Sequence, residues 1–260
     1  MIKVSVNGAL GRMGSTVCQA VDDDSELELT NSIDINSNQD KTINGQNIYK
    51  DISTMLKNSD PDLIVDFTNR ESFLTLVRSA VPKGIKIVSG STGLQNEDYE
   101  EIKKLCDKYN CGVLSASNFA VGAILLMHLS SIAGQYFDYV DLLESHHENK
   151  IDAPSGTAIT LGELAAKSRK VNFNSVKKFD RTNKSNSRKE GEIGFAVTRG
   201  GEIAGEHTVS FIGKNDRIDL QHKAFNRSIF VEGAIKASIF LSQSQPGKFT
   251  MKDVINSSTT

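Results

Sequence analysis

The first 119 residues alternate between short apolar runs and segments whose apolar residues have helical spacing. Apolar runs at 63–65, 85–88 and 113–114 are each followed by a polar or glycine-containing turn. Such alternation predicts a parallel sheet with helices on both faces and right-handed crossovers. Ligands of these sheets bind beyond the carboxyl ends of the strands, so the turns after the runs are candidate binding positions.

The N-terminal segment has the pattern of a strand, a glycine turn and a helix. The run Ile2–Val6 precedes Gly8, Gly11 and Gly14, and a helical pattern follows. Glycine lets the backbone turn tightly, approach a pyrophosphate closely and pack a helix against a strand. The spacing is GxxGxxG rather than GxGxxG, so by itself it does not separate dinucleotide binding from an ordinary turn.

An acidic residue follows the second apolar run at the distance expected for a residue that binds the adenosine ribose. Asp34 comes twenty positions after Gly14, directly after the run Leu27–Ile33. A carboxylate there suits the free ribose hydroxyls, and no arginine follows at once to bind a 2′-phosphate. The pattern slightly favours NADH over NADPH, although Lys41 could still reach a phosphate.

The remainder of the chain predicts a second domain of another kind. An apolar helical pattern covers 121–136, and three segments with strand-like content are separated by turn residues: 193–198, 207–212 and 217–222. We expect a mixed or antiparallel sheet, hence an α+β domain whose open sheet offers an oligomer interface. His207 and His222 lie in these predicted strands and are expected to have structural roles.

The amphipathic pattern at 228–241 and the short segment after it are expected to return to the first domain. The predicted fold is therefore α/β, with a Rossmann-type dinucleotide-binding domain at 1–119 and 228–260. Residues 120–227 form the predicted α+β domain for substrate binding and oligomerisation, with a mixed sheet. Two polar stretches, 36–49 and 171–191, predict loops.

Composition excludes several classes of partner. The net charge of -2 gives no bias toward nucleic acid or membrane, and the basic stretch at 171–191 has few aromatic residues on which bases could stack. No apolar segment approaches the ~20 residues that span a bilayer, and no secretory pattern precedes Ile2, so a cytoplasmic protein is expected. The three cysteines lack zinc-site spacing and predict buried thiols, and no metal site is predicted.

One stretch, Glu144–Ala158, concentrates residues that could carry chemistry. It contains His146, His147 and Lys150, and it ends in a Ser-Gly-Thr turn at 155–157. An apolar run precedes it and a helical pattern follows it, which predicts a strand-to-helix loop. Backbone N–H groups at the start of that helix would attract a carboxylate or phosphate. Consecutive strand residues point to opposite faces, so the two histidines are not expected to bind one metal ion.

These segments together resemble the 4-hydroxy-tetrahydrodipicolinate reductase family, also called dihydrodipicolinate reductases. The resemblance extends over nearly the whole chain, and its most specific part is Lys150–Ala158. The segments that carry it are Val4–Gly14, Asp66–Thr68, Gly90–Gly93, Ser117–Phe119, Glu144–His147, Lys150–Ala158, Gly205–Thr208 and His222–Ala224. The resemblance implies an enzyme of the diaminopimelate route to lysine, a homotetramer that reduces a cyclic unsaturated dicarboxylate with NADH or NADPH.

The resemblance also implies roles for single residues. His146 would donate a proton with Lys150 as its partner, and a histidine suits this task because it titrates near neutrality. The substrate carboxylates would be bound by His147, Ser155, Gly156 and Thr157. The cofactor would be bound by Gly8, Ala9, Leu10, Gly11, Arg12, Met13, Asp34, Gly90, Ser91, Thr92, Ala116, Ser117, Asn118 and Phe119. Phe67 is added from its own position in a polar turn after a strand, where we expect it beside the nicotinamide. One departure is Glu148-Asn149, where family members often carry a basic residue.

Two other functions are compatible with the pattern. One is a different two-domain NAD(P)-dependent dehydrogenase, which would reduce other substrates and be indifferent to pyridine-2,6-dicarboxylate. The other is a non-catalytic dinucleotide-binding regulator, which would bind NADH without oxidising it. The combination of His146, Lys150 and an anion site argues against a regulator, because a sensor needs no proton donor.

Overall fold

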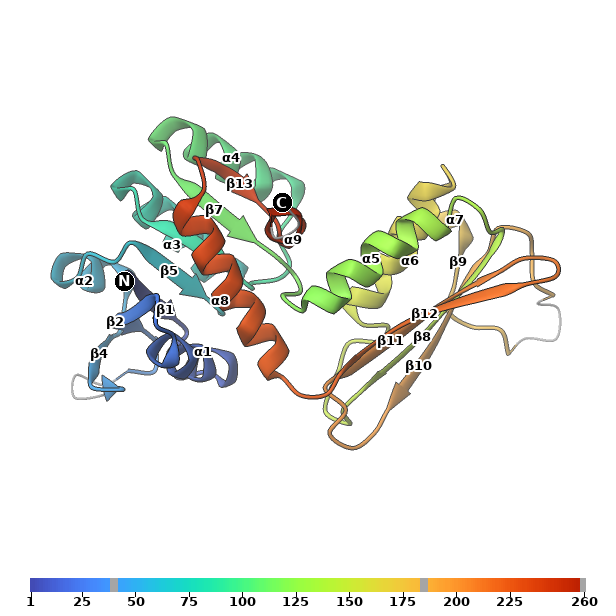
Figure 1. Ribbon diagram of the computed structural model, residues 1–260, viewed down its shortest axis with the longest axis horizontal. Helices are drawn as coiled ribbons and strands as arrows, with labels where there is room; N and C mark the ends of the chain where they lie inside the picture. Colours follow the sequence, from blue (N-terminus) through green and yellow to red (C-terminus); the bar gives the residue numbers. More distant parts are fainter. Residues whose placement is uncertain (38–41, 183–186, 258–260) are drawn as a thin grey trace. The chain divides into compact units, whose positions relative to one another are not determined.

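A computed structural model describes residues 1–37, 42–182 and 187–257. The chain divides into two compact units (Figure 1), Met1–Phe119 with Ser228–Thr260, and Ala120–Arg227. Within the described ranges, none of the helices combines the length and the apolar character that crossing a membrane requires.

The first unit is built on an eight-stranded sheet. Its strands are β1 (Ile2–Asn7), β2 (Leu27–Ile33), β3 (Thr42–Ile43), β4 (Gln46–Tyr49), β5 (Leu63–Asp66), β6 (Lys86–Ser89), β7 (Gly112–Ser115) and β13 (Gly247–Phe249). Their order is β13-β7-β6-β5-β1-β2-β4-β3, and only β3 is antiparallel to its neighbour. The prediction of a parallel Rossmann-type sheet is confirmed. Strand order reverses between β1 and β5, where ligands of such sheets bind.

Helices cover both faces of this sheet. Helix α1 (Arg12–Asp23) contacts α8 (Ser228–Gln243) on one face, and the other face carries α2 (Ile52–Asn58), α3 (Arg70–Ala80) and α4 (Asn96–Tyr109) (Figure 1). The shorter η1 (Val81–Lys83) and α9 (Met251–Ser257) follow α3 and β13. The core beneath α3 and α4 is made of fully buried side chains, among them Ile64, Phe73, Leu76, Ile87 and Ile102.

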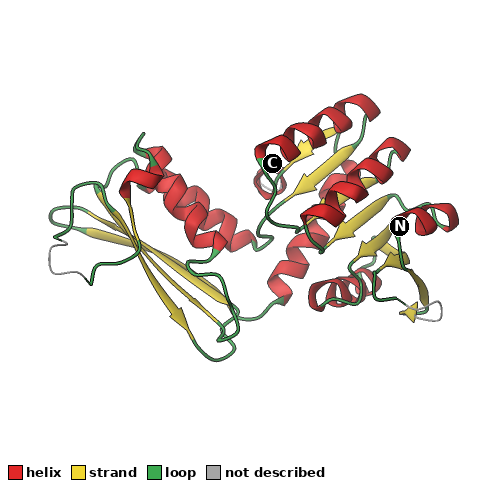
Figure 2. Cartoon of the chain, turned by 180° about the vertical axis from the view of Figure 1, so that it is seen from behind, coloured by secondary structure: helices red, strands yellow, loops and turns green. Residues whose placement is uncertain are grey.

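The second unit is built on a five-stranded mixed sheet, as predicted. Its strands are β8 (Tyr139–His146), β9 (Lys177–Lys178), β10 (Ile193–Arg199), β11 (Gly205–Ile212) and β12 (Arg217–Ala224). Strand β10 runs parallel to β8 and β9, whereas β11 is antiparallel to β8 and β12. The helices are α5 (Val121–Ala133), α6 (Gly156–Ser168) and α7 (Phe173–Val176). In Figure 2, α5 and α6 lie together on one face of the sheet, and none of the described helices of this unit covers the other face.

Both predictions of uninterrupted loops were wrong. Strand β4 lies within 36–49, where Ile48 is the buried residue that pairs with Ser32 of β2. A four-residue strand with one buried apolar side chain is too short to give a periodic signal. Helix α7 and strand β9 lie within 171–191, and they too are shorter than a periodic pattern requires.

Helix α1 packs against the glycine turn with no room for side chains. A Cβ atom on Gly14 would lie 2.0 Å from the carbonyl oxygen of Gly8, which is backbone and cannot rotate away. Gly8 itself has a φ of +84°, a left-handed conformation that glycine adopts without strain. The glycine pattern is therefore required by packing before any ligand is considered.

We expect Gly14→Ala to lower the free energy of unfolding by about 1–3 kcal/mol, because α1 must move away from the turn. Urea denaturation measures the change. Ser15→Ala places the same side chain at the next, exposed position of α1 and should change stability by less than about 0.5 kcal/mol. Equal stability of the two variants would contradict the close packing.

Candidate functional site

The turn between β1 and α1 uses most of its own backbone donors. The N–H groups of Gly8 and Gly11 donate to Ile33 and Gly8, respectively, at 2.8 and 3.0 Å. Gly11 is the N-cap of α1 and has no side chain to satisfy the first turn. A helix leaves the N–H groups of its first turn without intrahelical partners, so those of Arg12 and Met13 could donate to an anion at the positive end of the helix dipole. The predicted segment 8–13 thus has the shape and donors that a pyrophosphate requires.

Asp34, the residue after β2, holds this turn in place. Its carboxylate accepts hydrogen bonds from the N–H groups of Leu10 and Asn36, both at 2.9 Å. A carboxylate has about four acceptor positions, so two remain for ribose hydroxyls. The next residue, Ile35, is 77% exposed and brings no positive charge. Lys41, the predicted alternative phosphate ligand, lies outside the described residues.

A buried carboxylate ties together the ends of three neighbouring strands. Asp66, at the end of β5, accepts hydrogen bonds from Asn7 (2.8 Å), Thr68 (2.6 Å), Ser89 (2.6 Å) and Ser91 (2.7 Å). Burial raises the pKa of Asp66, and these four hydrogen bonds oppose that rise. The four donors fill all the acceptor positions of the carboxylate. Asp66 therefore holds the turn at 90–92 in place through its hydrogen bond with Ser91. The sequence pattern did not predict this role.

Three of the predicted cofactor residues, Phe67, Gly90 and Phe119, lie close together in the turns after their strands. The rings of Phe67 and Phe119 are 5.6 Å apart between centroids. A Cβ atom on Gly90 would lie 2.4 Å from Phe67 and 3.2 Å from Phe119, so glycine leaves both rings in place. The other predicted residues of these two turns differ in exposure: Ser91 is buried, Ala116 and Asn118 are half-buried, and Thr92 and Ser117 are exposed.

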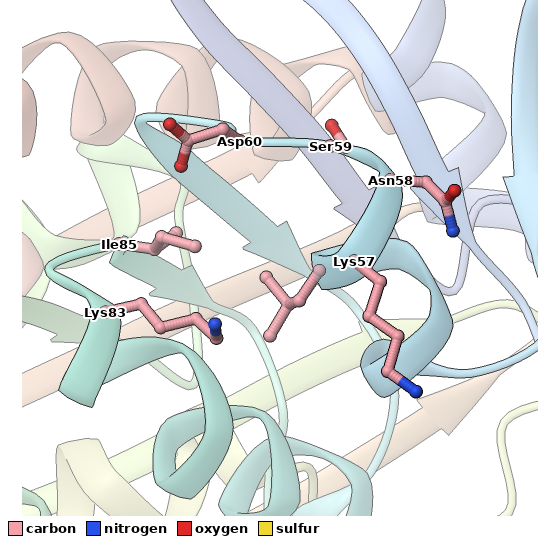
Figure 3. Close-up of a pocket in the computed structure, with 7 residues that line it drawn as sticks. Lys57, Asn58, Ser59, Asp60, Lys83 and Ile85 are labelled. Carbon is pink, nitrogen blue, oxygen red and sulfur yellow. The ribbon is translucent and has the colours of Figure 1, made fainter.

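A pocket of about 400 Å³ lies elsewhere in the first unit (Figure 3). Its lining residues are Leu56, Lys57, Asn58, Ser59, Asp60, Lys83 and Ile85. These residues precede β5 and β6, at the amino ends of the strands, whereas Asp34 and Asp66 lie at the carboxyl ends. The pocket is therefore separate from the predicted dinucleotide-binding edge.

In the second unit, Glu144 and His146 lie two residues apart on β8 and point to the same face. Both are buried, at 1% and 8% exposed, and Glu144 Oε2 lies 2.5 Å from His146 Nδ1. Arg199, opposite His146 in β10, donates to both oxygens of Glu144 at 2.8 Å. Burial would raise the pKa of Glu144, but hydrogen bonds from Arg199, His146 and Ser155 outweigh it and lower the pKa.

The loop after β8 is held to the strand through Ser155. Its N–H donates to Glu144 Oε1 at 2.9 Å, and its hydroxyl caps α6 at the N–H of Ala158 and bonds His207 Nε2 at 2.9 Å. Burial lowers the pKa of His207 to about 4, so this ring is neutral at pH 7. Ser155, predicted to bind substrate, has its polar groups engaged inside the unit and supports the start of α6. His207 has the structural role that its place in a strand predicted.

The other predicted residues lie around this support. Lys150 is half-buried and pairs with Asp152 at 2.8 Å. His147 follows the end of β8 and is half-buried, while Gly156 and Thr157 form the first turn of α6. Burial first, and then the charges of Lys150 and Arg199, lower the pKa of His146, whereas Glu144 raises it. A titratable imidazole, a cation and a helix N-terminus thus gather at one end of the sheet.

Glu144 and Arg199 are functional candidates that sequence reasoning did not single out. Glu144 carried a usable signal, since it lies two positions before His146 in a predicted strand and must share its face. Arg199 carried none, because it is brought to Glu144 by pairing between strands more than fifty residues apart.

Comparison with known proteins identifies a family for nearly the whole chain. The family models described as dihydrodipicolinate reductase, N-terminus and C-terminus, match residues 2–119 and 122–255. The 4-hydroxy-tetrahydrodipicolinate reductase of Polynucleobacter necessarius is 32% identical, with 98% of each chain covered. That of a Wolbachia strain from Drosophila simulans is 35% identical over 98% of this chain and 99% of its own.

A solved structure shows the same two-unit fold. The dipicolinate-bound dihydrodipicolinate reductase from Paenisporosarcina sp. TG-14 aligns with a TM-score of 0.80 and 24% identity, covering 96% of this chain and 97% of the other. That likeness supports the fold, and the family models and the curated relatives support membership. The chain therefore belongs to the dihydrodipicolinate reductase family.

Proposed function

We propose that this protein catalyses the NAD(P)H-dependent reduction of 4-hydroxy-tetrahydrodipicolinate (dihydrodipicolinate) to tetrahydrodipicolinate, in the diaminopimelate route of lysine biosynthesis. The observation that carries the proposal is the buried His146, held by Glu144 beside Lys150 and the start of α6. The curated relatives are reductases by name, and dipicolinate is bound in the related solved structure.

A nicotinamide dinucleotide, when bound, would supply the hydride for the substrate. In the first unit, we assign the pyrophosphate to residues 8–13 and the adenosine ribose to Asp34. The nicotinamide end is assigned to Phe67, residues 90–92 and residues 116–119. The uncapped start of α1 and the space kept open by Gly90 support these assignments.

The second unit binds a dianion and moves a proton. His147 and the first turn of α6, at Gly156 and Thr157, bind the carboxylates, where the helix dipole favours negative charge. Lys150 provides a full positive charge against the conjugated system. His146 delivers the proton that must accompany hydride addition, from the ring nitrogen that does not face Glu144.

We expect His146→Gln to lower kcat by about 10²–10⁴-fold, because the proton donor is lost. Lys150→Ala should lower kcat by about 10²–10³-fold, because positive charge at the conjugated system is lost. Oxidation of NADH is followed in a coupled assay with freshly synthesised substrate. NADH affinity, measured by fluorescence, should survive in both variants.

His128→Gln is the matched control, since His128 is exposed on α5, away from the Glu144 cluster in sequence and element. Its turnover should equal that of the wild-type protein. Near-normal turnover in both His146→Gln and Lys150→Ala would contradict the roles proposed for these two residues. Wild-type protein that binds NADH but oxidises none would favour a regulator.

We also propose a slight preference for NADH over NADPH, from Asp34 and the absence of a positive charge on Ile35. Ile35→Arg places a guanidinium where a 2′-phosphate is expected, so it should shift the ratio of kcat/KM values about tenfold toward NADPH, equivalent to ~1.4 kcal/mol. Parallel assays with the two cofactors measure the ratio, with Ser15→Ala as the control. A wild-type preference for NADPH would contradict the proposal.

We propose that the protein assembles as a homotetramer through the uncovered face of the second sheet. Leu143 points to that face and is 47% exposed, whereas its neighbour Leu142 is buried beneath α5 and α6. We expect light scattering to give a tetramer for the wild-type protein and smaller species for Leu143→Glu, because an interface buries this side chain. Lys57→Glu in the first unit should stay tetrameric. A monomeric wild-type protein would contradict the proposal.

A further inference from the structure

Glu144 determines which nitrogen of His146 can exchange a proton. The 2.5 Å contact joins Glu144 Oε2 to His146 Nδ1, so the proton of the neutral ring is held at Nδ1. His146 Nε2 is then the nitrogen without that proton, and it faces Gly205. A Cβ atom on Gly205 would lie only 3.0 Å from Nε2, so glycine keeps this side of the ring open.

Arg199 opposes the effect of Glu144 on the imidazole. A carboxylate beside an imidazole stabilises its protonated form, but the bidentate Arg199 neutralises this carboxylate. Arg199 also donates to the carbonyl oxygen of Asp152 at 2.7 Å, which ties the loop before α6 to β10. Glu144 thus raises the proton affinity of His146, and Arg199, on the adjacent strand, lowers it.

The groups that face His146 come from each element packed against it. They are Glu144 on its own strand, Arg199 on β10, His207 on β11, and Lys150 with Asp152 in the loop before α6. The His146 and His207 rings meet edge to face, with centroids 5.1 Å apart. Of these groups, Glu144 alone bonds a ring nitrogen of His146 directly.

We propose that Glu144 and Arg199 are an opposed pair of positioning residues for the proton donor. Glu144 fixes the orientation and tautomer of His146, and Arg199 limits the basicity that Glu144 confers on it. The inference rests on the proposed function, in which His146 donates the proton, but its central measurement needs no substrate. It assigns to both residues an effect on proton affinity that a purely structural ion pair does not have.

The two substitutions predict shifts in opposite directions. Glu144→Gln removes the negative charge and leaves Arg199 uncompensated, so the pKa of His146 falls by about one pH unit. Arg199→Met leaves Glu144 unneutralised, so the pKa of His146 rises by about one pH unit. The pH above which turnover declines should move in the same two directions, because the protonated ring is the active form.

The experiment is a pH titration of the full-length protein with 15N-labelled histidine rings, observed by NMR. The chain has five histidines, and His146→Gln identifies the signals of residue 146. The wild-type ring should be the Nδ1–H tautomer when neutral. Glu144→Gln and Arg199→Met should shift its pKa down and up, and Glu144→Gln with Arg199→Met should lie between them.

Arg70→Met is the matched control. It breaks an equally bidentate pair with Asp98 in the first unit, at 2.6 Å for each hydrogen bond, and should leave the pKa of His146 unchanged. Shifts in one direction for both test variants, or none in folded protein, would overturn the proposal. The wild-type tautomer needs no substitution, so an Nε2–H ring would overturn it even if the variants fail to fold. Absence of turnover in wild-type protein would instead overturn the proposed function.

Discussion

The candidate site in the second unit depends on the carboxylate of Glu144. One oxygen holds His146, the other holds the N–H of Ser155 at the start of α6, and Arg199 bonds both. A buried carboxylate with a missing partner is costly, so each of these groups is required for the position of the others. The imidazole and the helix N-terminus are therefore set relative to each other by one side chain rather than by the loop between them.

The first unit also contains a buried carboxylate, but there it is stabilised without a cation. Asp66 is as deeply buried as Glu144, but its four partners are the neutral groups of Asn7, Thr68, Ser89 and Ser91. Hydroxyl and amide donors fix the ends of the strands without adding positive charge to the cofactor edge. Glu144, in contrast, is paired with a guanidinium beside the proposed anion site, where added positive charge would be useful.

The sequence predicted what depends on local periodicity and composition. Alternating runs up to Phe119 predicted the parallel sheet, and the Ser-Gly-Thr turn predicted the start of α6, because both signals lie within short windows. Contacts between distant strands gave no such signal. The parallel pairing of β8 with β10 brings Arg199 to Glu144, and neither residue type alone indicates it. Ser155 was recognised as part of the site, but its engagement with His207 depends on the register of β11 with β8.

The ion pair of Lys150 with Asp152 balances charge at the proposed dianion site before a dianion binds. Lys150 is paired with Asp152, whose side chain is 59% exposed and makes a weak contact in solvent. In the proposed function, a substrate carboxylate would replace Asp152 at little cost, because water would solvate the released carboxylate. Glu144 cannot be displaced in this way, since it is buried and its loss would remove the carboxylate acceptor of His146, Arg199 and the N–H of Ser155. Asp152, the exchangeable acid, thus pairs with the residue proposed to contact substrate, whereas Glu144, the permanent acid, pairs with the groups that must stay in place.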